Sequence, residues 1–128
     1  MRCVKNGLRL LCPCCLALCG VGCSKSTMHW IEQAKSDDPA QRLRAIHELQ
    51  GRTSEPDAVV PALIDALQDK NNYVRRDAAR ALAAFGENAK GAVPALTARL
   101  RDDEPSVRKA AAQSLREIDP AAEKLKTK

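Results

Sequence analysis

Residues 57–85 carry apolar side chains at the spacing of an amphipathic α-helix. In the first half of this segment they occupy positions i, i+3, i+4 and i+7, namely Val60, Leu63, Ile64 and Leu67. This spacing forms one apolar stripe about 100° wide on a helix. A second helical run follows, from Asn72 to Phe85, after the polar residues 69–71. The segment therefore predicts two short antiparallel helices.

The pattern repeats along the chain. The tetrapeptide Val60-Pro61-Ala62-Leu63 returns as Val93-Pro94-Ala95-Leu96, and 93 − 60 gives a period of 33 residues. A period of this size built from two helical runs is typical of a helical solenoid, in which stacked neighbours build the core. The expected first helices are Thr27–Ala34, Val60–Leu67 and Val93–Leu100, and the expected second helices are Pro39–Gln50, Asn72–Phe85 and Pro105–Ile118.

We therefore expect an all-α fold, a short right-handed α-solenoid of about three antiparallel helix pairs. The domain spans residues 28–118, with units of about 28–51, 57–86 and 90–118, and residues 119–128 form a charged C-terminal cap or tail. Equivalent apolar residues recur in columns: Trp30, Leu63 and Leu96; Ala45, Ala78 and Ala111; Leu49, Leu82 and Leu115. Pro61 and Pro94 are expected in the first turns of their helices. Gly51 and Gly86 are expected as left-handed C-caps.

Composition narrows the possible functions. Aromatic residues make up only 2% of the chain, which argues against a large aromatic-lined cavity. The formal net charge is +5, but Arg2, Lys5 and Arg9 contribute three of these charges. Without them the balance is 21 − 3 = 18 basic residues against 16 acidic ones, or +2. This balance lacks the concentrated basic stripe that phosphate binding requires.

The first 22 residues have the pattern of a secretory signal peptide. A basic segment precedes the largely apolar residues 10–22, a run that is too short to cross a bilayer. The sequence Gly20-Val21-Gly22-Cys23-Ser24 resembles the lipobox of bacterial lipoproteins. That resemblance implies cleavage before Cys23, lipidation of Cys23, a short tether at 23–27, and a membrane-anchored protein facing the periplasm or cell surface, with the outer membrane favoured. Secretion as a soluble protein, or retention in the cytoplasm, are the alternatives.

All six cysteines lie between Cys3 and Cys23, so no disulfide can hold the helical part together. We interpret them as small apolar residues of the leader. A metal or iron–sulfur site is the alternative, but Cys12-Pro13-Cys14-Cys15 lacks the paired spacing of familiar zinc sites. No metal site or cofactor is expected.

Over about residues 27–118 the sequence resembles the HEAT repeats, particularly the bacterial HEAT-like repeats also found in phycobilisome lyases. The motif Asp-Xaa5-Arg appears as Asp69 with Arg75 and as Asp102 with Arg108. In the first unit Ser36 takes the place of the aspartate before Arg42. The resemblance implies that these aspartates and arginines form a hydrogen-bonded ladder between successive repeats. We therefore assign them a structural role.

The sequence contains no motif for nucleophilic, metal-dependent or phosphate-binding chemistry, and we expect a protein that is not an enzyme. The expected binding site is the exposed face of the second helices, which we call the second-helix surface. Its candidate residues for binding a partner are Leu43, His47, Arg76, Arg80, Lys109, Gln113 and Arg116. A merely solvated helix face is the alternative interpretation of the same residues.

Three functional hypotheses follow. The first is a HEAT-repeat protein-interaction module anchored to the bacterial cell envelope, with an unknown protein partner and no small-molecule substrate. The second, implied by the resemblance, is a bilin-lyase-like protein, although export and a shallow three-repeat curve argue against enclosing a tetrapyrrole. The third is a nucleic-acid-binding HEAT module, which the near-neutral mature charge disfavours.

Overall fold

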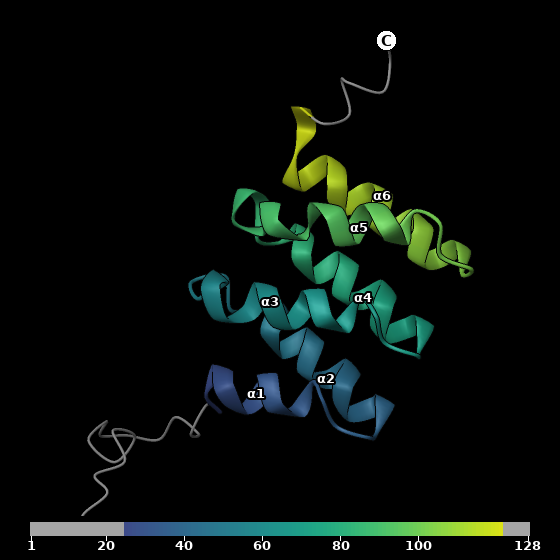
Figure 1. The fold of residues 1–128 in the computed structure, drawn as a ribbon. Coiled ribbons are helices and arrows are strands. Elements are labelled where there is room, and N and C mark those ends of the chain that lie inside the picture. The colour runs from purple at the N-terminus through teal and green to yellow at the C-terminus, as the bar shows by residue number, and fades with distance from the viewer. Residues whose placement is uncertain (1–24, 122–128) are drawn as a thin grey trace, which may run out of the picture.

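A computed structural model describes residues 25–121 of the chain, and this part is helical without any strand. The elements are, in chain order, α1 (Thr27–Gln33), α2 (Pro39–Gln50), α3 (Pro56–Ala66), α4 (Asn72–Ala83), the 3₁₀ helix η2 (Gly86–Ala92), α5 (Val93–Arg99) and α6 (Pro105–Ile118). Three successive helix pairs stack along one axis (Figure 1). The predicted all-α solenoid of three helix pairs is therefore confirmed.

The helices form two layers. In Figure 1, α1, α3 and α5 lie roughly parallel in front, and α2, α4 and α6 cross behind them. Within each pair the two helices contact each other, and between pairs α2 packs on α4 and α4 on α6. Each pair therefore buries its apolar side against its neighbours, which is the way a solenoid without a globular core is stabilised.

The core consists of the residues that recur at the 33-residue period. Ala45, Ala78 and Ala111 are completely buried in the second helices. The side chain of alanine lets the axes of neighbouring helices approach closely, while Leu49 and Leu82 fill the space beside it. On α4, Val74, Ala78, Ala81 and Leu82 are completely buried, and Phe85, just after the helix, is buried as well.

Helix α3 begins earlier than predicted. It starts at Pro56 rather than at Val60, so Pro61 lies inside the helix and not in its first turn. Pro56 takes the position that tolerates a missing amide hydrogen, and the prediction for Pro61 is wrong. Pro94, by contrast, lies in the first turn of α5 as expected.

The two glycines expected as helix caps differ. Gly86 follows α4 with a φ of +50°, in the left-handed region as predicted. Gly51 has a φ of −75°, so the prediction of a left-handed cap there is wrong. The chain continues past Gly51 in a turn in which the amide of Arg52 donates to the carbonyl of Leu49 at 3.0 Å. Helix η2, which follows Gly86, was not predicted; it packs against α3, α4, α5 and α6.

Several predictions lie outside the described residues. These are the signal peptide, its cleavage site, lipidation of Cys23 and most of the charged tail. Within residues 25–121, no helix has both the length and the apolar character needed to cross a membrane.

Candidate functional site

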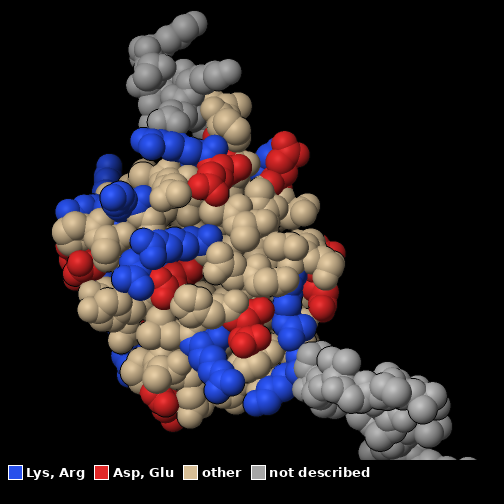
Figure 2. All heavy atoms as spheres, turned by 180° about the vertical axis from the view of Figure 1, so that it is seen from behind, with Lys and Arg blue, Asp and Glu red and all other residues tan. Residues whose placement is uncertain are grey.

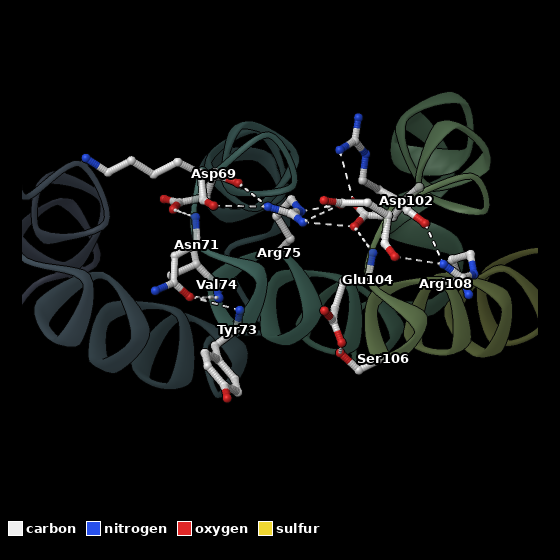
Figure 3. Close-up of polar contacts among 12 residues, drawn as sticks. Asp69, Asn71, Tyr73, Val74, Arg75, Asp102, Glu104, Ser106 and Arg108 are labelled. Carbon is white, nitrogen blue, oxygen red and sulfur yellow. Dashed lines mark hydrogen bonds and ion pairs between the residues drawn. The ribbon is translucent and has the colours of Figure 1, made fainter.

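The aligned arginines lie between the helix layers, where successive repeats meet. Arg75 of α4 donates from Nε to Asp102 Oδ2 and from Nη2 to Asp102 Oδ1, both at 2.9 Å (Figure 3). Its third nitrogen, Nη1, donates to the backbone carbonyls of Asp69 at 2.9 Å and Lys70 at 3.2 Å. Arg75 therefore holds the turn of its own repeat and the aspartate of the next one.

Arg42 makes the same contacts one repeat earlier. Its Nε and Nη2 donate to the Asp69 carboxylate at 2.7 and 2.9 Å, and its Nη1 donates to the carbonyls of Ser36 and Asp37. The side-chain pairs thus span 27 residues and join different units, whereas the Asp-Xaa5-Arg spacing relates residues within a unit. The side chain of each aspartate accepts hydrogen bonds from the arginine of the preceding repeat. Ser36, at the equivalent position of the first repeat, has no preceding repeat among the described residues.

Asp102 is the more deeply buried of the two ladder carboxylates, with a side chain that is 1% exposed against 11% for Asp69. The residue as a whole is 7% exposed, and its side chain also accepts a hydrogen bond from the amide of Glu104 at 3.0 Å. Burial opposes ionisation, but the hydrogen bonds from Arg75 and from this amide outweigh it and hold the pKa of Asp102 well below its usual range. The hydrogen bond to Asp102 likewise raises the pKa of Arg75. The pair remains fully charged, and neither group is available to a ligand.

The second-helix surface contains two groups of the predicted binding residues. The first lies between α2 and α4, around the buried Asp77. Arg76 Nε donates to Asp77 Oδ1 at 2.8 Å, and this bond raises the pKa of Arg76. His47 Nε2 lies 3.5 Å from Asp77 Oδ2, and the guanidinium of Arg76 lies 5.2 Å from the centroid of the Tyr73 ring. Asp77 therefore holds the guanidinium of Arg76 in place, and the exposed His47 lies beside the same carboxylate.

The second group lies between α4 and α6. Arg80, Gln113 and Glu117 line a hollow of about 320 Å³ together with Ala83 and Ser114. Gln113 Nε2 donates to Glu117 Oε1 at 3.2 Å. The hydroxyl of Ser114 is buried, 2.6 Å from the carbonyl oxygen of Ala79, and thus ties α6 to α4 at the base of the hollow. The hollow combines a cationic group with amide and carboxylate groups.

The remaining predicted residues are more scattered. Leu43 is partly buried and packs against the core, so only part of its side chain faces solvent. Lys109 and Arg116 are exposed on α6. Figure 2 shows the face opposite to that of Figure 1, where basic side chains form separate patches with acidic ones between them. This face lacks a continuous basic stripe.

The candidate residues predicted from the sequence include neither Tyr73 nor Asp77. Tyr73 is the only tyrosine of the chain, and it is 55% exposed. That it is the only tyrosine was the feature of the sequence that could have identified it as a candidate. The role of Asp77 depends on two helices meeting at that point, and residue spacing along one helix cannot show this. Within residues 25–121, no group of His, Cys, Asp and Glu is arranged to hold a metal ion.

Comparison with known proteins gives two results. The family model described as HEAT repeats matches residues 27–122. Among solved structures, the complex of CpcE and CpcF of phycocyanin lyase from Nostoc sp. PCC7120 contains a similar chain, with 32% sequence identity and a TM-score of 0.68. The similarity covers 88% of this chain and 46% of that chain, so this chain spans about half the length of the matched one. No curated protein sequence matches.

The second comparison corrects one prediction. We expected a protein that is not an enzyme because its sequence contains no catalytic motif. That prediction is contradicted, because the matched chain belongs to a lyase complex and the similarity points toward an enzyme class. Missing motifs exclude only the reactions that depend on those motifs.

Proposed function

This chain belongs to the HEAT-repeat family, and we propose that it binds a protein partner along the second-helix surface. The observation that carries this proposal is the arrangement of Tyr73, Arg76 and Asp77 in the central repeat. Tyrosine and arginine are enriched among the residues that dominate protein–protein binding energies. Here the arginine is held against the exposed tyrosine by a buried carboxylate, so little side-chain freedom is lost when a partner binds.

The proposal predicts where a partner makes contact. A photo-crosslinking amino acid placed at Arg80, beside this group on α4, should form a defined cross-link in cells that produce the full chain. The same amino acid at Ala98, exposed on α5 in the other layer, is the control. Changing Tyr73 to Ala should remove the Arg80 cross-link. Equal cross-linking from both positions, or a product unaffected by Tyr73→Ala, would argue against the second-helix surface.

Lyase activity of the bilin-lyase kind is the second candidate, and it is supported by the similarity to the phycocyanin lyase chain. A binding site for the propionate groups of a tetrapyrrole would use Arg80 in the hollow of about 320 Å³. Because this chain spans about half of the matched one, a second subunit would complete the enclosure. The test is co-elution of a linear tetrapyrrole with the full chain, alone and with the bound partner. An Arg80→Glu variant that retains the pigment equally well would count against this candidate.

We further propose that Cys23 is lipidated and anchors the module to the cell envelope, with the outer membrane favoured. The support is the basic start of the leader, its short apolar run and Gly22-Cys23 at its end. Three acyl chains on one residue exceed the two signals that stable anchoring needs. The second-helix surface would then face a partner in the periplasm or at the cell surface.

A further inference from the structure

The ladder of arginines ends with an incomplete step at Arg108. Its Nη1 donates to the carbonyls of Asp102 at 2.8 Å and Asp103 at 3.0 Å, the same contacts that Arg42 and Arg75 make within their own turns (Figure 3). In those two residues Nε and Nη2 hold the carboxylate of the following repeat. Among residues 25–121, no carboxylate meets Nε or Nη2 of Arg108. The guanidinium is thus oriented by two backbone carbonyls, and the described residues place no carboxylate against its Nε and Nη2.

The apolar residues around Arg108 show the same incompleteness. In the central unit three of them are completely buried: Leu67, Ala79 and Leu82. Their equivalents 33 residues later are each partly exposed: Leu100, Ala112 and Leu115. The last unit therefore keeps the residue types that the central unit uses for stacking, but nothing in the described part of the chain covers them.

We propose that this C-terminal end binds a further HEAT-type helix pair supplied by a partner chain, whose turn between the two helices presents an aspartate to Arg108. The aspartate accepts the two parallel hydrogen bonds from Nε and Nη2, as Asp69 and Asp102 do within the chain. Its helices cover the side chains of Leu100, Ala112 and Leu115. A bidentate arginine–carboxylate pair fixes orientation as well as affinity, so it sets the register of stacking.

The N-terminal end of a second copy fits this description poorly. There Ser36 takes the position of the aspartate. Exposed Gln41 and Glu48 occupy the positions of the buried Val74 and Ala81, so this end has the polar surface of a capping repeat. Two C-terminal ends facing each other would bring two Arg108 guanidinium groups together without a carboxylate between them. A different HEAT-type chain is therefore the occupant that the contacts favour.

The C-terminal end of the solenoid is separate from the second-helix surface, so binding at one does not depend on binding at the other. An Arg80→Glu variant should stack a further helix pair as well as the parent chain does. The two proposals can therefore fail independently of each other.

A synthetic peptide with the sequence of residues 86–118 serves as the probe, because it contains a helix pair with Asp102 in its turn. Isothermal titration into the full chain should show saturable binding. Arg108→Gln in the chain should weaken it about tenfold or more, as should Asp102→Asn in the peptide. Arg101→Gln, which removes a nearby exposed charge, is the matched control. Binding unaffected by Arg108→Gln, in a variant whose circular-dichroism melt remains cooperative, would overturn the proposal.

If the separate peptide does not fold, the same contact can be tested with the helix pair joined covalently to the chain. A copy of residues 86–118 inserted after Ile118 places its aspartate 27 residues after Arg108, since 102 + 33 = 108 + 27. This extension should raise the melting temperature above that of the same extension with Asn in place of the copied Asp102. Equal melting temperatures would overturn the proposal. A second result would also overturn the proposal, namely a Glu123→Gln variant of the original chain whose melting temperature falls as much as that of Arg108→Gln. Arg108 would then already be paired with Glu123.

Discussion

Arg75 and Asp102 belong to neighbouring repeats, and two parallel hydrogen bonds of 2.9 Å join them. The side chain of Arg75 is 10% exposed and that of Asp102 only 1%. Asp103 also accepts a bond from Arg75 Nη2, at 3.1 Å, but its side chain is 93% exposed. Two adjacent aspartates thus contact one arginine from very different environments, which makes them a matched pair for measuring the value of the buried contact.

Changing Asp102 to Ala should lower the free energy of unfolding by about 3 to 5 kcal/mol, because it leaves a buried guanidinium without its carboxylate. Asp103→Ala removes a solvent-screened contact and should have a much smaller effect. Urea unfolding of both variants measures the difference. Similar losses for the two would show that the buried bidentate pair is not the main connection between the second and third repeats.

The lowered pKa of Asp102 gives stability a defined dependence on pH. An unfolded aspartate titrates near pH 4, so the contribution of Asp102 is complete above about pH 4 and is lost as the pH falls toward its lower folded pKa. The urea midpoint of the parent chain should therefore fall on acidification from about pH 5 to pH 2. Asp102→Asn should flatten this dependence. Parallel curves for the two proteins would contradict the assignment.

Leu82 is completely buried in the only repeat that has a described repeat on each side. Leu82→Asp should unfold the whole domain, because it places an unpaired carboxylate in the centre of a three-repeat array. The control is Lys70→Asp, an exposed position equivalent to that of Asp103 in the next repeat. A cooperative circular-dichroism melt of Leu82→Asp near the parent midpoint would contradict this expectation.

The proposed lipid anchor predicts a change in fractionation. The parent chain should sediment with membranes, and Cys23→Ser should move to the soluble fraction because the acyl chains can no longer be attached. Cys19→Ser removes a neighbouring thiol and should leave fractionation unchanged. If the Cys23→Ser protein still sediments with membranes, the anchor lies elsewhere.

The sequence alone determined the repeat architecture. Its 33-residue period predicted the helix pairs, and the aligned columns predicted equivalent positions for residues that the fold buries, such as Ala45, Ala78, Leu63 and Leu96. This was possible because burial in a solenoid follows from residue type and local period, and every unit meets the same kind of neighbour. The starts and ends of elements were less predictable. Both Pro56 and Pro61 are compatible with the first turn of α3, and η2 packs against four other helices, which the local sequence does not show.

The tertiary structure decided which side chains meet across repeats. Residue spacing related Asp69 to Arg75, but the carboxylate of Asp69 binds Arg42, and Arg75 binds the aspartate of the following unit. Within residues 25–121 it also brought His47 and Arg76 to the same carboxylate of Asp77, and it gave Arg108 two backbone carbonyl partners but no carboxylate. These relations depend on how one helix pair is placed on the next. The sequence pattern shows the period at which the repeats stack, but it does not show which side chains of neighbouring repeats come into contact.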